Sequence, residues 1–402
     1  MLRTTTLAVL LLGLLSAVFA PAETKEWPRW RGPDGNGIAP DADVNPKALA
    51  GQPKIAWKAS LGTGFSSVAV AGSLVYGLGN AGGTDTVFCL NADTGRIAWK
   101  HSYRCAQGSY PGPRATPTVH EGVVYTLSRE GHLFALEAAT GKVLWLKHLV
   151  DDLGIQPPGW DFAGSVVVAG DRLILNAGRS GLALDRSTGE TVWESGAGPG
   201  GYATPVLAAL AGRPSAVIFG ERAAYGVDVA DGTVRWSFPW VTGSDVNAAD
   251  PVVFADRVFV ASAYDKGCAL YDVSGSQPAA VWRNNAFNTH FSSFVAMDGS
   301  LYGIDGDARV PNGGVLRCLN VRTGKTAWGA PVGFGSLIAT RDHLVVLNST
   351  GTIIVAEASS AGYRELARCS LPRNQYWTPP ALAGGKLFVR NLTGDLFAID
   401  VK

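Results

Sequence analysis

The amino-acid sequence predicts an all-β fold, an eight-bladed β-propeller built from four-stranded antiparallel blades. Three observations support this prediction: a motif that recurs along the chain, an even spacing of tryptophans, and two chain ends that each carry part of a blade. Successive tryptophans from Trp57 to Trp328 lie 42, 46, 48, 43, 46 and 46 residues apart. A period of about 40–50 residues is typical of one propeller blade.

The recurring motif contains a small residue, Leu, a polar residue, two variable residues, Thr-Gly, three more residues and Trp. Its first copy runs from Cys89 to Trp99, and we expect it to form a strand, a tight turn and the outer strand of a blade. Glycine supplies the positive φ of the turn, and the indole can wedge against the next blade, burying on the order of 200 Å². The other copies occupy residues 135–145, 183–193, 227–236, where Asp replaces Thr, 270–282, with an insertion around Pro278, and 318–328. The tryptophans expected to dock one blade on the next are Trp57, Trp99, Trp145, Trp193, Trp236, Trp282 and Trp328.

Two more strands precede each copy of the motif. One is an apolar run, as in residues 73–76 and 386–389. Before it comes a shorter innermost strand that often starts with a polar residue and proline, as in Thr116-Pro117, Thr204-Pro205 and Asp250-Pro251. Short apolar runs bounded by turn residues predict buried strands, so each repeat supplies four strands.

The two ends of the chain determine the number of blades. Residues 396–402 read as a third strand with no Trp strand after it, and residues 55–58 as a Trp strand with no repeat before it. We expect the N-terminal strand to complete the C-terminal blade, because this closure removes two open sheet edges. Six Trp repeats, one degenerate copy with Leu366-Ala367 in the place of Trp, and this composite blade make eight.

The N-terminal residues are typical of a targeting segment. Arg3, an apolar run from Leu7 to Phe19 and the small residues 20–22 predict a cleaved signal peptide over residues 1–22. The run is too short to span a bilayer comfortably. There is also no cysteine near the cleavage site that could carry a lipid anchor. We therefore expect a periplasmic or secreted protein without a transmembrane segment, with an N-terminal extension over residues 23–51 and the propeller over residues 52–402.

Composition narrows the classes of function. The chain has 34 basic and 33 acidic residues and no Lys/Arg tract, which argues against nucleic acid as a partner. Glycine accounts for 50 of 402 residues, well above the roughly 7% of average proteins, as many turns require. The five cysteines are odd in number, so at least one is unpaired within the chain. Cys89 and Cys318 fill the small-residue position of the motif and read as buried hydrophobic residues. No Cys or His spacing typical of a metal site occurs, so no metal is expected.

The Leu-x-x-x-Thr-Gly-x-x-x-Trp repeat resembles the tryptophan-docking motif of the pyrroloquinoline-quinone (PQQ) repeat superfamily, over residues 52–402. That superfamily includes quinoprotein dehydrogenases and cofactor-free, BamB-like outer-membrane assembly factors, so the resemblance implies a fold and leaves activity open. Residues 27–33, Trp-Pro-Arg-Trp-Arg-Gly-Pro, resemble a lead-in of exported members, and we expect them to pack against the propeller rim. In the dehydrogenases PQQ lies under two adjacent cysteines, with Ca²⁺ held by Glu, Asn and Asp; this chain has no two adjacent cysteines.

Loops that enter the innermost strands meet at one mouth of a propeller, where ligands bind. In this chain these loops are rich in Gly, Pro, Asn and aromatic residues. The candidate ligand-binding residues are Tyr110, Arg114, Trp160, Asp161, Tyr202, Asp250, His290, Asn374, Gln375 and Trp377. The alternative is that they satisfy one another's hydrogen bonds, and Arg114 opposite Asp161 or Asp250 reads equally well as a structural ion pair. No hydrolase, metalloprotease, P-loop or Rossmann motif is present, so no catalytic residue is identified.

Three functional hypotheses follow. The first is an exported monomeric propeller that binds a protein, glycan or small-molecule partner without chemistry and without a cofactor. The alternative is a minimal PQQ-dependent oxidoreductase, which would need PQQ and Ca²⁺. A third, periplasmic assembly of outer-membrane proteins, rests on the family resemblance alone.

Overall fold

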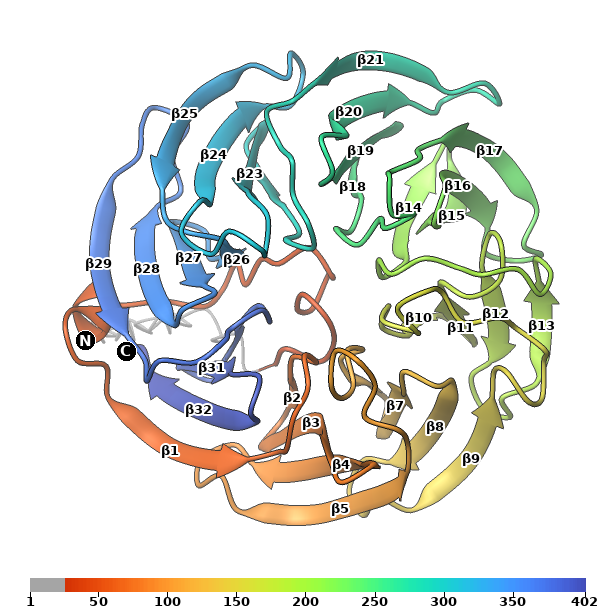
Figure 1. Ribbon diagram of the computed structural model, residues 1–402, viewed down its shortest axis with the longest axis horizontal. Helices are drawn as coiled ribbons and strands as arrows, with labels where there is room; N and C mark the ends of the chain where they lie inside the picture. Colours follow the sequence, from red (N-terminus) through yellow and green to blue (C-terminus); the bar gives the residue numbers. More distant parts are fainter. Residues whose placement is uncertain (1–25) are drawn as a thin grey trace, which may run out of the picture.

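The structure, a computed structural model, describes residues 26–402 and arranges them as eight four-stranded antiparallel sheets around a central axis (Figure 1). The predicted eight-bladed propeller is confirmed. The predicted signal peptide lies outside the described residues. In the described part of the chain the only helical element is a 3-10 turn, η1 (Pro46–Leu49). No helix there is both long and apolar enough to cross a membrane.

Seven blades follow the order of the chain. Blade 1 contains β2 (Ala69–Ala71), β3 (Leu74–Ala81), β4 (Thr84–Asn91) and β5 (Ile97–Arg104), and blade 2 contains β6 (Thr118–His120), β7 (Val123–Leu127), β8 (His132–Glu137) and β9 (Val143–His148). Blade 3 contains β10 (Val167–Ala169), β11 (Arg172–Leu175), β12 (Leu182–Asp185) and β13 (Thr191–Glu194), and blade 4 contains β14 (Val206–Leu210), β15 (Arg213–Phe219), β16 (Ala223–Asp228) and β17 (Val234–Pro239). Blade 5 contains β18 (Val252–Phe254), β19 (Arg257–Ser262), β20 (Gly267–Asp272) and β21 (Ala279–Asn284), and blade 6 contains β22 (Val295–Met297), β23 (Ser300–Asp305), β24 (Val315–Asn320) and β25 (Thr326–Pro331). Blade 7 contains β26 (Gly335–Ala339), β27 (His343–Asn348), β28 (Thr352–Glu357) and β29 (Glu365–Ser370).

The eighth blade is shared by the two ends of the described chain. It contains β30 (Ala381–Ala383), β31 (Lys386–Arg390), β32 (Asp395–Asp400) and β1 (Ile55–Ser60), which pairs antiparallel with β32. The predicted ring closure is therefore confirmed, and Figure 1 shows β1 lying beside β32. Neighbouring blades share hydrophobic clusters, so the core forms a continuous belt around the ring.

The pairing of the two outer strands explains the small residue of the repeat. In blade 1 Cys89 lies directly opposite Trp99, with a β-bulge between Cys89 and Leu90. The same pairing places Ala135 opposite Trp145 and Cys318 opposite Trp328. A small partner leaves room for the indole to cross the sheet. This accounts for the burial of Cys89 and Cys318, which were expected to act as small hydrophobic residues.

Most of the repeat tryptophans dock one blade on the next, as expected. The Trp57 indole N–H donates to the Ala92 carbonyl of the following blade at 2.9 Å, and its ring covers the turn glycine Gly95. Equivalent indole-to-carbonyl bonds of 2.8–3.2 Å are made by Trp99, Trp145, Trp193, Trp282 and Trp328. Each indole therefore satisfies its one donor while it buries its ring between two blades.

Trp236 departs from the expected docking role. Its ring stacks on Phe238 of its own strand, with 5.8 Å between the ring centroids. It also covers Gly226 in the same sheet, where an added Cβ would lie 2.1 Å from the indole. The next turn, at Gly275, has no atom within 4 Å of such a Cβ. The insertion around Pro278 gives this turn a different form, which removes the docking surface that other blades offer.

The polar residue of the motif also has a structural role. Asp185 accepts backbone N–H groups from Ser187 and Thr188, both at 2.9 Å, in the turn before β13. Such a side chain replaces backbone partners that the turn leaves open. The hydrogen bonds of Ser187 and Thr188 lower the pKa of Asp185 to about 2.

We expect alanine in place of a turn glycine to lower the free energy of unfolding more where a tryptophan covers the turn than where none does. In Gly95→Ala the new Cβ would lie 2.6 Å from the Trp57 ring, at a φ of 67°. Overpacking and the left-handed backbone should together lower the free energy of unfolding by about 2–4 kcal/mol. Gly122→Ala is the matched control and should lose only the backbone part, since Gly122 has a φ of 78° but its Cβ would meet open space. Chemical denaturation of both variants checks this, and equal losses would contradict the docking role of Gly95.

Candidate functional site

Residues 26–39 lie on the innermost strands, which corrects the expectation that this segment packs on the rim. Trp27 exchanges two backbone hydrogen bonds of 2.8 Å with Val70 of β2. Val119 of β6 donates to the Pro28 carbonyl at 2.7 Å. Ala39 then donates to the Ala339 carbonyl of β26 at 2.8 Å. The edges of the inner strands carry unpaired backbone groups, and the segment supplies partners for them as it crosses the centre of the ring (Figure 1).

A belt of side-chain oxygens surrounds the axis just before the inner strands begin. Each belt residue lies two positions before its strand, and each one after Ser67 accepts a backbone N–H from the belt residue of the preceding blade. Five such bonds of 2.8–3.2 Å join the blades. The oxygen belt consists of Ser67, Thr116, Ser165, Thr204, Asp250 and Ser293. These bonds explain the polar residues that precede proline in the sequence.

Asp250 is the acidic member of this belt, and the N-terminal segment takes up its carboxylate. Oδ1 accepts the Thr204 N–H at 2.8 Å, and Oδ2 accepts the Trp30 indole N–H at 2.6 Å. Arg31 lies 3.6 Å away, is 5% exposed, and also donates to the Phe294 carbonyl. Burial lowers the pKa of the Arg31 guanidinium, and Asp250 opposes that shift. Asp250 therefore anchors the segment and does not lie open at the mouth as expected.

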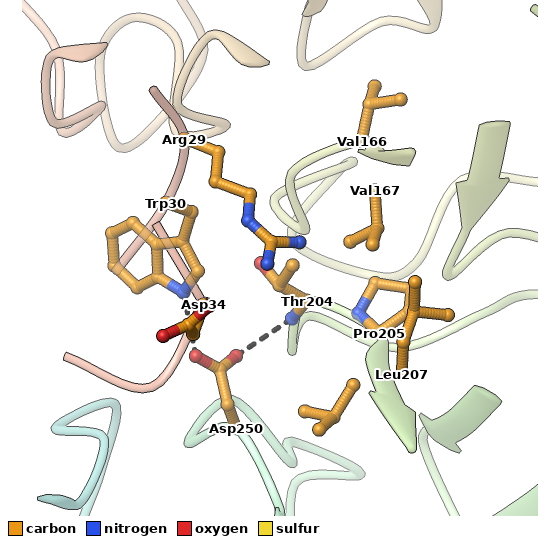
Figure 2. A pocket seen from close by; sticks show the side chains of 11 residues that line it. Arg29, Trp30, Asp34, Val166, Val167, Thr204, Pro205, Leu207 and Asp250 are labelled. Carbon is orange, nitrogen blue, oxygen red and sulfur yellow. Dashed lines mark hydrogen bonds between the residues drawn. The ribbon is translucent and has the colours of Figure 1, made fainter. Parts of the chain in front are cut away.

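The space left beside the segment is small. A cavity of about 50 Å³ remains between residues 29–35 and the inner strands β10 and β14. Figure 2 shows the Arg29 side chain extended towards Thr204, with Trp30 and Asp250 close together. A volume of this size admits a few water molecules and is far below the roughly 300–1,000 Å³ of a typical small-molecule site.

Aromatic side chains from five loops form a row at the mouth. Tyr110 contacts Trp160 edge-on with centroids 5.4 Å apart, and Trp377 with centroids 6.4 Å apart. Trp377 in turn stacks on Phe65 at 5.5 Å and contacts Phe291 at 5.1 Å. Tyr110 and Trp160 remain 45% and 44% exposed. The structure brings together three residues that the sequence singled out, Tyr110, Trp160 and Trp377, and adds Phe65 and Phe291, whose loops carry no distinguishing motif.

Arg114 holds the two exposed rings of this row in place. Its Nη1 donates to the Trp160 carbonyl at 2.6 Å and its Nη2 to the Tyr110 carbonyl at 3.2 Å. Asp161 lies 3.6 Å from Nη1 and also pairs with Arg129. Burial lowers the pKa of Arg114, and the charge of Arg129 lowers it further. Arg114 is thus a structural ion-pair partner of Asp161, as the alternative interpretation proposed.

The other predicted site residues border the row. The Tyr202 hydroxyl accepts the Trp160 N–H at 3.2 Å, and burial raises the pKa of Tyr202 to about 12. Asn374 donates to Thr393 Oγ1 at 2.9 Å and accepts the Gln375 N–H at 2.8 Å, so both residues are engaged locally.

His290 joins the row through a ring contact with Phe291, with centroids 5.0 Å apart. Its Nε2 lies 2.8 Å from the Tyr264 hydroxyl, and Asp307 lies 3.8 Å from its Nδ1. Burial lowers the pKa of His290, against the opposing effect of Asp307. Tyr264 and Asp265 both have left-handed backbone, with φ of 62° and 57°. The structure thus places a Tyr-His-Asp series beside the aromatic row.

The repeat, the ring closure and the tryptophan docking together match one known family. A family model described as outer membrane protein assembly factor BamB matches residues 47–145 and 83–330. The chain belongs to this family. Its repeats are PQQ-like, as the sequence resemblance indicated.

Two groups of relatives share the fold. The structure of BamB from Moraxella catarrhalis is similar with a TM-score of 0.65 and 17% identity, over 87% of this chain and 99% of that one. Quinohemoprotein alcohol dehydrogenase from Comamonas testosteroni gives a TM-score of 0.70 and 14% identity, over 95% of this chain and 81% of that one. In sequence, the chain is 26% identical to quinohemoprotein alcohol dehydrogenase ADH IIB of Pseudomonas putida over 294 residues, 69% of this chain. It spans 41% of the length of that relative.

Proposed function

We propose that this protein is an exported, monomeric, non-catalytic propeller that binds a partner at the loop mouth through its aromatic row. The observation that carries the proposal is the exposure of Tyr110 and Trp160, which stay almost half exposed although Arg114 fixes both of their loops. Rigid aromatic side chains offer a large contact area at a small cost in conformational entropy. Such a row can bind a ligand whose flat apolar groups or sugar rings pack against the exposed aromatic faces.

Charge supports the same class of ligand. Arg114 and Arg129 already pair with Asp161, and Asp307 pairs with Arg309. The charged groups beside the row are therefore largely neutralised by one another. The family description, outer membrane protein assembly factor, is consistent with a protein partner that contributes an extended segment.

The described residues do not fit PQQ with Ca²⁺. The N-terminal segment fills the centre of the ring, and both oxygens of Asp250 are engaged by Thr204 and Trp30. Ca²⁺ takes six to eight oxygen ligands, whereas the one cluster of three or more His, Cys, Asp and Glu ligands in residues 26–402 contains a thiol and an imidazole. These observations support a binding role over quinoprotein oxidation, which the relationship to alcohol dehydrogenases keeps as the alternative.

We expect the double variant Tyr110→Ala/Trp160→Ala to weaken ligand binding about 10–30-fold, the loss typical of an aromatic hot spot. Tryptophan fluorescence and calorimetry against neutral oligosaccharides and unstructured peptides would measure it. Tyr363→Ala is the control, because Tyr363 packs on Trp328 at the outer strands, away from the mouth. Unchanged binding by the double variant would place the site elsewhere.

The alternative function has its own arm in the same experiment. Purified protein is mixed with PQQ and Ca²⁺, and dye-linked oxidation of primary alcohols is followed. We expect no turnover above the protein-free rate. Turnover that depends on both additives would overturn the non-catalytic assignment and leave the aromatic row as a substrate channel.

A further inference from the structure

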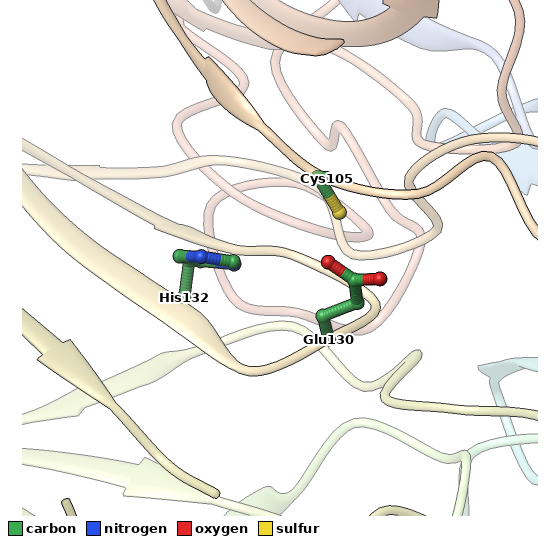
Figure 3. Close-up of side chains that lie close together, drawn as sticks. All are labelled: Cys105, Glu130 and His132. Atoms are coloured by element: carbon green, nitrogen blue, oxygen red, sulfur yellow. The ribbon is translucent and has the colours of Figure 1, made fainter. Parts of the chain in front are cut away.

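Cys105, Glu130 and His132 come together at the seam between blades 1 and 2 (Figure 3). Cys105 directly follows β5, Glu130 lies in the tight turn between β7 and β8, and His132 is the first residue of β8. One ligand atom from each side chain lies within 4.8 Å of those of the other two. No other group of three such ligands is as close in the part of the chain that the structure describes.

The three donors match the preferences of zinc. A thiolate, an imidazole nitrogen and a carboxylate oxygen are its usual protein ligands, at about 2.0–2.3 Å from the metal. Tetrahedral geometry at those lengths places donors roughly 3.5 Å apart, so small side-chain rotations would close the present arrangement. Cys105 is fully buried, whereas Glu130 and His132 are half-buried. The half-buried side leaves a path by which an ion can enter.

Ser128 orients two of the three ligands. Its Oγ lies 3.0 Å from His132 Nδ1 and accepts the His132 backbone N–H at 2.9 Å. With Nδ1 engaged, Nε2 is the nitrogen left to bind a metal, an arrangement usual for zinc-bound histidine. Burial and Asp85 raise the pKa of the Cys105 thiol, and a hydrogen bond with Ser128 acts in the opposite direction. Ser128 itself is fully buried, so its orientation is set by the fold.

Asp85 provides an independent sign that a ligand belongs here. It is 0% exposed, and its Oδ1 accepts from Asn80 at 2.6 Å, but its Oδ2 has no hydrogen-bond partner. Asp85 lies close to Cys105, because the Asn80 amide nitrogen donates both to Asp85 Oδ1 and, at 3.0 Å, to the Cys105 carbonyl. The neighbouring cation, Arg129, pairs with Asp161 through Nε and Nη2, and its Nη1 makes no hydrogen bond to Asp85. A buried carboxylate oxygen without a partner is costly, and a cation held by Cys105 would remove that cost.

We propose that Cys105, Glu130 and His132 form a Zn²⁺ site, with the buried Asp85 carboxylate as the adjacent oxygen that faces the ion. The site joins the end of β5 to the β7–β8 turn, so the metal ties blade 1 to blade 2 at the mouth. It also fixes the start of the loop that carries Tyr110 and Arg114. No spacing rule could reveal it, because the ligands come from two blades and lie 25 and 2 residues apart.

The test uses the purified chain, stripped with a chelator and titrated with Zn²⁺ alone. We expect one Zn²⁺ per chain by elemental analysis, and a rise in thermal stability on loading, because an ion that binds only the folded state stabilises it. Co²⁺ in place of Zn²⁺ should show a thiolate-to-cobalt charge-transfer band in the near ultraviolet. His132→Ala and Cys105→Ser should each weaken binding by at least about 100-fold, and Ser128→Ala by about 10-fold, as loss of an orienting partner does.

Matched controls separate this site from adventitious binding. Cys89→Ala removes another buried thiol of blade 1 at a position where other repeats carry alanine, and His120→Ala removes an exposed imidazole. Both should keep full stoichiometry and affinity. If Cys105→Ser fails to fold, Glu130→Gln and His132→Ala on the exposed side of the cluster decide the question. Absence of stoichiometric Zn²⁺ binding, or equal binding by the ligand variants and the controls, would overturn the proposal.

Discussion

Asp250→Ala is expected to lower the free energy of unfolding by about 3–5 kcal/mol, the usual cost of leaving one member of a buried ion pair alone. The variant strands the Arg31 guanidinium, which is 5% exposed, and removes the acceptor of the Trp30 indole and the Thr204 N–H. Equilibrium denaturation measures the loss. Limited proteolysis should then cut the N-terminal segment, residues 26–39, before the blades.

Graded variants isolate the charge from the hydrogen bonds. Asp250→Asn keeps an acceptor for Thr204 and should cost less than the alanine variant. Arg31→Met leaves the carboxylate buried without its cation, so it should also destabilise the protein. The double variant Arg31→Met/Asp250→Asn buries no charge and should recover much of the loss, since buried ion pairs are often replaceable by uncharged groups. Additive losses in the double variant would contradict a direct Arg31–Asp250 coupling.

Trp57→Ala is expected to destabilise the protein by about 3–5 kcal/mol, the range for truncating a buried tryptophan. Trp57 is 8% exposed, covers Gly95 and donates to Ala92 across the junction between the eighth blade and the first. Its loss should loosen β1, the strand that closes the ring. Hydrogen exchange should therefore accelerate in β1 and β32 before the other blades.

Two further variants make this prediction specific. Trp57→Phe keeps most of the apolar area but loses the indole hydrogen bond, so it should cost about 1–2 kcal/mol. Trp236→Ala removes an equally buried indole that packs within its own sheet, and it should leave exchange in β1 unchanged. Faster exchange in β1 in both alanine variants would show that Trp57 has no special part in ring closure.

Two features of the structure act on the candidate site: the N-terminal segment in the ring and the contacts that hold the loop of Tyr110. The N-terminal segment crosses the centre of the ring (Figure 1), so the proposed ligand would meet the aromatic row at the mouth and not the axis below it. Arg114 and the proposed Zn²⁺ site act on the same loop, one from each end. A partner that needs a rigid aromatic surface would benefit from both, because preorganised side chains lose little entropy on binding.

How far sequence reasoning reached differs between fold and site. The strand count, the closure of the ring by β1 and the docking of most tryptophans were all predictable, because turns, strand patterns and their period are local properties of the chain. Trp236 lies in the core cluster shared by blades 4 and 5, but it does not cover a turn glycine of the next blade, since the insertion around Pro278 alters that turn. At the mouth, the sequence singled out Tyr110, Trp160 and Trp377 because their loops lead into inner strands on one face, and the structure places these rings in one row. Asp250 was expected there as well, but in the structure its carboxylate accepts a hydrogen bond from Trp30 and forms an ion pair with Arg31.

The sequence by itself determined the eight blades, since a repeat of fixed period can bury its hydrophobic faces only by stacking on copies of itself. Only the tertiary structure decided where the N-terminal segment lies, because its partners are unpaired strand edges and a carboxylate more than 200 residues away. The same holds for Cys105, Glu130 and His132, which share no motif. Their proximity depends on the angle at which one blade packs against the next, and that angle is a property of the closed ring.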